Sequence, residues 1–316
     1  MRGAVFAALS ALGLFVAGAA SAEPVLTIRD AAVHVTVVAE ARSDVQVTVT
    51  RANPSLAVDI RREGDRVIVQ GHLPPIGTGC YGNGLSSGAR IDMIRLIPEA
   101  ALTQIVVHAP LDLVLQSTRG AVFAQVGPSR SLRLGISGCG RWAVGDVAGR
   151  LAVINSGSSD IHAGNAGRAE LTMQGSGDAW LNHVAGSLDG RIPGSGDLTV
   201  ASAGPTTFSV QGSGDIRGGV FDRGVSTTIA GSGDFTADRA DGPVSVRIMG
   251  SGDVRLHDGH ATTLILAILG SGDIAYGGVA GGLDATILGA GDIRVRQVTG
   301  PVRQTIHGSG DVHVGS

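Results

Sequence analysis

The residues of this chain best suited to chemistry are aspartates that recur in one short motif, Gly-Ser-Gly-Asp. From Asp178 onward, successive motif aspartates are separated by 19, 18, 19, 19, 20, 19 and 19 residues. A column of carboxylates could bind Ca²⁺, but the calcium-binding Gly-x-Gly-x-Asp roll repeats about every nine residues. The longer repeat favours a structural corner whose carboxylates accept nearby backbone N–H bonds, with a calcium-dependent rod as an alternative. The corner aspartates are Asp178, Asp197, Asp215, Asp234, Asp253, Asp273, Asp292 and Asp311.

The cysteines, Cys80 and Cys139, each lie in a glycine-rich segment. Neither belongs to a Cys/His spacing typical of a zinc site, and neither lies in a nucleophile motif. An oxidising compartment outside the cytoplasm would permit a disulfide between them. We therefore expect Cys80 to pair with Cys139, with two free thiols as the alternative.

The remaining polar residues do not form a recognisable catalytic set. A polysaccharide lyase or hydrolase needs acids and bases that converge on one patch, whereas the charges outside the corners are spread along the repeats. His257, Asp258 and His260 lie close together, but they occupy a turn, where polar residues are ordinary. We expect no catalytic residue and no dedicated metal site, and we keep a carbohydrate-active β-helix enzyme as an alternative.

A repeating fold must position these residues. A fixed period of about 19 residues is typical of a solenoid whose stacked coils share one core. Apolar residues alternate on both sides of each corner, and the hexapeptide repeat usual in left-handed β-helices is absent. We therefore expect an all-β, right-handed parallel β-helix-like solenoid. The inward positions before the corners are Ile136, Ile154, Met173, Ile192, Val210, Ile229, Ile248, Ile268, Ile287 and Ile306.

Three regions are predicted along the chain. Residues 1–22 have the charge, apolar run and Ala-Ser-Ala ending of a cleaved signal peptide. Residues 23–101 are expected to form an N-terminal β region, with a glycine- and proline-rich loop at 73–90 and a strand at 93–97. Residues 102–316 are expected to form the solenoid.

Composition and charge restrict the partners and the location. The net charge of −3 gives no reason to expect nucleic acid. After cleavage of the signal peptide, no segment is long and apolar enough to span a bilayer. We expect an exported protein that is periplasmic, held at the outer-membrane surface or secreted.

One strand is apolar on both of its faces. Residues 264–269 read Leu-Ile-Leu-Ala-Ile-Leu, so the outward positions are apolar as well as the inward ones. Such a face marks either a contact between copies of the chain or a surface covered by its own N-terminal strands. The predicted interface residues are Met249, Ile265, Ala267, Leu269 and Leu288.

The repeated corners, each followed by an apolar strand and preceded by a signal peptide and an N-terminal β region, resemble the bacterial GIN domain family. That family is described as the head domain of auto-transporter adhesins. The resemblance covers about Val25 to Ser316 and is strongest from Gly138 onward. It implies a β-solenoid exported to the cell envelope, with no established catalytic residues. We predict a structural or adhesion-type binding role, with an envelope, surface or glycan partner.

Overall fold

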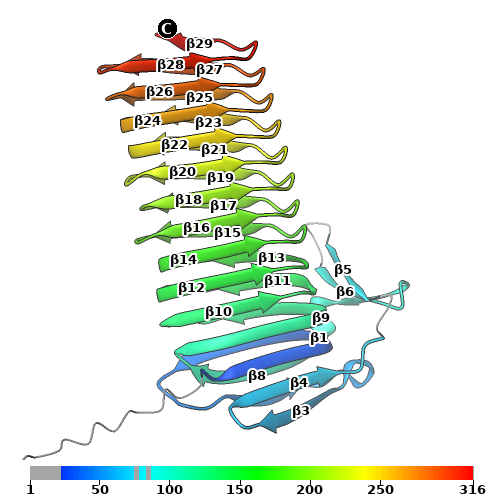
Figure 1. Cartoon of the computed structure of the whole chain (residues 1–316). Coiled ribbons are helices and arrows are strands. Elements are labelled where there is room, and N and C mark those ends of the chain that lie inside the picture. Colours follow the sequence, from blue (N-terminus) through cyan, green and yellow to red (C-terminus); the bar gives the residue numbers. More distant parts are fainter. Residues whose placement is uncertain (1–22, 75–77, 83–86, 316) are drawn as a thin grey trace, which may run out of the picture.

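The structure, a computed structural model, describes residues 23–74, 78–82 and 87–315. The predicted signal peptide, residues 1–22, lies outside this part of the chain. The described strands form a long rod of stacked coils, with a small sheet beside its N-terminal end (Figure 1). The predicted all-β parallel solenoid is therefore confirmed. Among the helices of the described residues, none has the length and apolar character that a membrane span requires.

Each regular coil contributes one strand before its corner and one after it, and each strand pairs in parallel with the second strand further along the chain. The strands before the corners are β10 (Ser131–Ile136), β12 (Val147–Asn155), β14 (Ala166–Met173), β16 (Leu188–Ile192), β18 (Thr206–Val210), β20 (Val225–Ile229), β22 (Gly242–Ile248), β24 (His260–Ile268), β26 (Leu283–Ile287) and β28 (Val302–Ile306). Those after the corners are β11 (Cys139–Val144), β13 (Ser158–Ala163), β15 (Ala179–Val184), β17 (Leu198–Ala203), β19 (Ile216–Phe221), β21 (Phe235–Ala240), β23 (Val254–Asp258), β25 (Ile274–Ala280), β27 (Ile293–Val298) and β29 (Val312–Val314).

The inward side chains of both stacks fill the interior of the rod. The predicted inward positions from Met173 to Ile287 are all buried, which confirms that part of the ladder. Phe208, Phe221 and Phe235 add an aromatic cluster, with ring centroids 5.3 to 6.1 Å apart. Each coil thus buries its apolar face only against its neighbours.

The register differs from the prediction at Ile154. Asn155, rather than Ile154, pairs with Ile136 and Met173 and is fully buried. The Asn155 amide donates to the carbonyl of Ser159 (2.6 Å) and accepts from the N–H of Gly157 (3.2 Å), so its polar atoms are satisfied inside the coil. Ile154 consequently points outward and is 53% exposed.

The corner glycines allow successive coils to approach closely. A Cβ atom built on Gly231 would lie 1.9 Å from the carbonyl oxygen of Gly212, one coil earlier. Gly233 stands in the same relation to Gly214, at 2.1 Å. From Gly175 to Gly310, none of the corner glycines has a φ in the left-handed region. The motif therefore requires glycine for space between coils and not for an unusual backbone conformation.

The stacking continues across residue 102, the predicted start of the solenoid. The long strand β9 (Asp112–Val126) pairs with β10 along its first half and with β11 along its second half. β1 (Val25–Glu40) pairs in parallel with β9. These two strands turn at Asp30 and Arg119, whose φ angles are +48° and +47° and whose side chains form an ion pair at 3.0 Å.

Antiparallel strands close the N-terminal end of the rod. β4 (Arg66–Gly71) and β8 (Thr103–Pro110) both pair with β1. Beyond them, β3 (Val58–Glu63) pairs antiparallel with β4, and β2 (Gln46–Arg51) pairs antiparallel with β8. Two short 3-10 helices, η1 (Pro54–Leu56) and η2 (Glu99–Ala101), complete this end.

The predicted loop at 73–90 is wrong over its second half. A separate antiparallel sheet, which we call the side sheet, consists of the strands β5 (Gly79–Gly82), β6 (Ser87–Ile91) and β7 (Arg95–Pro98). The strand predicted at 93–97 begins two residues later, because Asp92 and Met93 form the turn between β6 and β7. The backbone groups of these strands are hydrogen-bonded within the side sheet, and the irregular sequence gave no indication of this pairing.

Candidate functional site

The corner aspartates form a continuous ladder of hydrogen bonds along the rod. The N–H of each corner aspartate donates to Oδ1 of the aspartate one coil earlier, over 2.7 to 3.2 Å, from Asp160 to Asp311. We expected these carboxylates to accept backbone N–H bonds within their own turn. They do accept backbone N–H bonds, but each donor lies in the next coil, so the bonds join coils instead of closing each turn. One such bond lowers the pKa of Asp292, whose carboxylate accepts from Asp311.

Arginines in every second coil pair with the ladder carboxylates. Arg217 lies 2.7 Å from Asp197 and 3.0 Å from Asp215, and its bond to Asp197 raises the pKa of the guanidinium. Arg255 and Arg294 repeat this arrangement on the next two pairs of aspartates, with a short contact to one carboxylate and a 3.8 Å contact to the other. The ladder carboxylates from Asp197 to Asp292 thus have both a backbone donor and a nearby cation.

The predicted polar turn does not bring its three residues to one point. The carboxylate of Asp258 accepts from the N–H of Gly259 (2.8 Å), whereas the N–H of His260 donates to Asp241 (2.7 Å). Behind the turn, burial raises the pKa of Tyr276 to about 12, and its hydroxyl donates to a backbone carbonyl. Among the described residues, no group of three His, Cys, Asp or Glu could hold a metal ion.

The predicted interface face is exposed at four of its five residues. Met249, Ile265, Leu269 and Leu288 are 39 to 51% exposed. Ala267 is an exception: it is buried, because its short side chain lies between the longer Arg247 and Thr286 of the paired strands. The N-terminal strands lie at the other end of the rod and do not cover this face (Figure 1). The alternative of intramolecular covering is therefore wrong.

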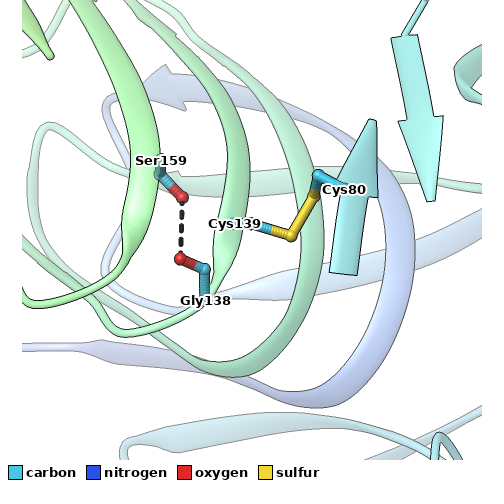
Figure 2. The surroundings of a disulfide bond; sticks show 4 residues. All are labelled: Cys80, Gly138, Cys139 and Ser159. Atoms are coloured by element: carbon cyan, nitrogen blue, oxygen red, sulfur yellow. Dashed lines mark hydrogen bonds between the residues drawn. A yellow bond between two sulfur atoms is a disulfide. The ribbon is translucent and has the colours of Figure 1, made fainter. Parts of the chain in front are cut away.

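A disulfide attaches the side sheet to the rod. The first corner reads Gly138-Cys139-Gly140-Arg141, so Cys139 takes the place of the motif serine. Its sulfur bonds to Cys80 of β5, with the two Cα atoms 5.8 Å apart. Figure 2 shows this bond next to a hydrogen bond from the buried hydroxyl of Ser159 to the carbonyl of Gly138. The disulfide thus fixes the side sheet to the first corner, and that corner is in turn hydrogen-bonded to the next coil through Ser159.

Arg141, which takes the place of aspartate in the same corner, makes a second attachment. Its guanidinium lies 2.7 Å from the hydroxyl of Ser87 on β6 and 3.1 Å from the carboxylate of Glu99. Ser87 also donates to Glu99 over 2.8 Å. An aspartate at position 141 would place a like charge beside Glu99, so the departure from the motif has a direct electrostatic reason.

A cavity of about 590 Å³, which we call the base pocket, lies between the side sheet and the rod. Tyr81 and Ser87 line it from the side sheet, and Arg141, Asp160 and His162 line it from the coils. The His162 ring stacks on Trp180 of the next coil, with centroids 4.3 Å apart and planes 13° from parallel, which fixes the orientation of the imidazole. Its polar donors, acceptors and aromatic rings suit noncovalent recognition of a polar ligand.

The sequence supplied parts of this site without showing that they converge. The sequence predicted the pairing of Cys80 with Cys139, but it did not identify Arg141, Tyr81 or the stacked pair of His162 and Trp180 as parts of a site. The usable signal was the interruption of the repeat, since the first two corners are the irregular ones. The contribution of the side sheet could not be predicted, because its residues are far in sequence from the coil residues that they contact.

Comparisons with known proteins cover most of the chain. The sequence model of the family described as "Putative auto-transporter adhesin, head GIN domain" matches residues 94–219 and 221–316. No curated protein matches the chain. Among solved structures, the chain is similar to a protein described as "Putative lipid binding protein" from Parabacteroides distasonis ATCC 8503, with 17% sequence identity, 93% of each chain covered and a TM-score of 0.30.

Proposed function

Because the chain belongs to the family described as the head GIN domain of putative auto-transporter adhesins, we propose that it is an exported, non-catalytic protein of the bacterial cell envelope with an adhesion-type binding role. The family description is adhesin-like and not enzymatic. Export is supported by the signal-peptide features of residues 1–22. The stacked coils act as a rigid support for the binding surface.

The observation that carries this proposal is the convergence of the non-repeating residues on the base pocket. Cys139 and Arg141 replace the serine and aspartate of the first corner, and both contact the side sheet. Stacking of coils alone needs neither substitution, because the later corners keep the motif and stack equally well. Residues that leave the repeat and meet around one cavity are best explained by recognition of a ligand.

The ladder is proposed to be structural and independent of calcium. Its carboxylates already accept N–H bonds from the next coil, and six of them lie beside an arginine. A cation bound there would have to displace these arginines. Melting curves recorded with calcium and with EGTA should therefore coincide, and a rise of the melting temperature in calcium would favour the calcium-dependent rod.

His162 and His313 offer a matched pair for testing the base pocket, because both lie two residues after a corner aspartate. Labelled mature protein would be applied to an array of bacterial and host surface polysaccharides and to intact cells. His162→Ala should weaken binding by about tenfold, because it removes a pocket wall and the stack on Trp180. His313→Ala, far from the pocket, should bind as the unaltered protein does.

Equal binding by the two variants would show that the base pocket is not the contact. Release of reducing ends or unsaturated sugars from any polysaccharide on the array would instead support the enzyme alternative. Circular dichroism of the same protein samples would show whether either variant is misfolded before binding and sugar release are measured.

A further inference from the structure

The most exposed apolar side chains of the described residues lie together at the turn of the side sheet. Met93 is 73% exposed, Ile94 is 87% exposed and Leu96 is 54% exposed. These fractions exceed those of the apolar face on the rod, where the largest value is 51%. We call these three residues the hairpin tip. Figure 1 shows the side sheet beside the flank of the stack, and the exposed fractions show that the described residues leave the tip open to another surface.

The backbone of this turn is unfavourable for the residues it carries. Asp92 and Met93 have φ angles of +53° and +61°, and the N–H of Ile94 donates to the carbonyl of Ile91 over 3.3 Å. A β-turn with positive φ angles at both central residues is of type I′, and it favours Asn-Gly or Asp-Gly at those two positions. A methionine in the second position is costly for folding, and backbone strain of this kind concentrates at functional sites.

The hairpin that carries the tip is firmly held. Ile91 and Ile97, on either side of the turn, are buried together with Phe123 and Leu102 of the rod. The Cys80 disulfide fixes the other edge of the same sheet, and Arg141 bonds to Ser87 at the start of its central strand, β6. An apolar tip on a rigid hairpin can enter a soft surface without losing much conformational entropy.

Two arginines flank the tip. In the register of the hairpin, Arg90 lies opposite Leu96, and Arg95 lies opposite Ile91. Both side chains are exposed, and no ion pair to either occurs among the described residues. The residues outside the described ranges contain no Asp or Glu that could neutralise them. With Asp92, the turn carries a net charge of +1, which suits an anionic surface and not a cationic one.

We propose that the hairpin tip inserts into the interface of an anionic lipid bilayer. Met93, Ile94 and Leu96 enter the boundary between headgroups and acyl chains, while Arg90 and Arg95 remain at the level of the lipid phosphates. This contact is separate from the base pocket, and it would hold the rod beside a membrane without any spanning segment. It does not depend on the proposed adhesion role.

Vesicle flotation of the mature, disulfide-bonded protein tests the proposal. Vesicles of phosphatidylglycerol and phosphatidylcholine in equal parts should bind the protein, and vesicles of phosphatidylcholine alone should bind it more weakly. Replacing both Met93 and Ile94 by serine should lower the partition coefficient at least tenfold, because the two most exposed apolar side chains no longer enter the acyl region. Ile154→Ser removes an apolar residue that is 53% exposed on the rod, outside the predicted interface, and should leave partitioning unchanged.

Met93→Gly separates the lipid contact from folding. Glycine suits the positive φ of position 93, so this variant should melt at a higher temperature than the unaltered protein while binding anionic vesicles less well. Arg90→Gln together with Arg95→Gln should abolish the preference for anionic vesicles. The proposal is overturned if the unaltered protein does not float with anionic vesicles, or if it floats equally well after the tip substitutions. A tip that binds only a protein partner would give the first of these results.

Discussion

Gly231→Ala tests whether the corner motif exists for close packing between coils. A methyl group at this position would lie 1.9 Å from the carbonyl oxygen of Gly212. An ordinary carbon–oxygen contact is above ~3 Å, so the two coils must separate locally by more than ~1 Å. The same carbonyl accepts the N–H of Ser232 over 3.1 Å, and this separation would take that bond beyond useful length.

The cost can be estimated from these two effects. Overpacking of a tightly packed site costs ~1–3 kcal/mol, and an unsatisfied backbone group adds ~1–3 kcal/mol. Alanine also restricts the unfolded chain, which returns ~0.4–1 kcal/mol. We expect the free energy of unfolding to fall by about 2–4 kcal/mol.

Urea denaturation followed by far-ultraviolet circular dichroism measures this change. Ser232→Ala is the matched control, because Ser232 is exposed and alanine already occupies the equivalent position at Ala290. The control should change the unfolding free energy by less than ~0.5 kcal/mol. If Gly231→Ala proved as stable as Ser232→Ala, the packing explanation of the motif would be wrong.

Three further predictions concern the ladder and the apolar face. Asp253→Ala should lower the free energy of unfolding by ~1–3 kcal/mol, because the N–H of the next corner loses its acceptor, whereas Asp284→Ala, on an exposed strand position, should have little effect in the same urea titration. The pKa of Asp292 is lowered in the folded protein, so its stabilising contribution is complete above the usual carboxyl pKa of ~3.9 and is lost as the pH falls; melting temperatures that stay constant from pH 5 to pH 2 would contradict a role for the ladder. Leu269→Ser combined with Leu288→Ser should reduce the mass found by light scattering if the exposed face joins copies of the chain, and an unchanged mass would exclude that contact.

Sequence periodicity was sufficient to predict the regular part of the rod. The inward ladder from Met173 to Ile287 follows from alternation around a recurring corner, because every coil solves the same packing problem. The same reasoning failed at Ile154, where a buried, hydrogen-bonded asparagine takes the apolar position. A satisfied polar side chain in a core cannot be distinguished in sequence from one that faces water.

The N-terminal part was less predictable because its corners use no glycine motif. Asp30 and Arg119 turn their strands with positive φ angles and are stabilised by pairing with each other across 89 residues. The Asp92–Met93 turn also lacks the Asn-Gly signal that usually marks such hairpins. In each case the conformation is imposed by tertiary contacts, which local sequence preferences cannot show.

The corner ladder distinguishes two parts of the molecule. The repeating coils can vary in number, whereas the N-terminal end of the rod with its side sheet cannot. Each corner offers a carboxylate to the coil that follows and an N–H to the coil that precedes, so one added coil satisfies its neighbours in the same way as the others do. The ladder begins at Asp160, directly above Arg141, where the repeat is broken by contacts to the side sheet. Insertion or loss of a coil would therefore leave the base pocket and the hairpin tip intact while it changed the length of the rod. The repeating residues set the length of the rod, and the non-repeating residues at its base are the ones able to determine what it binds.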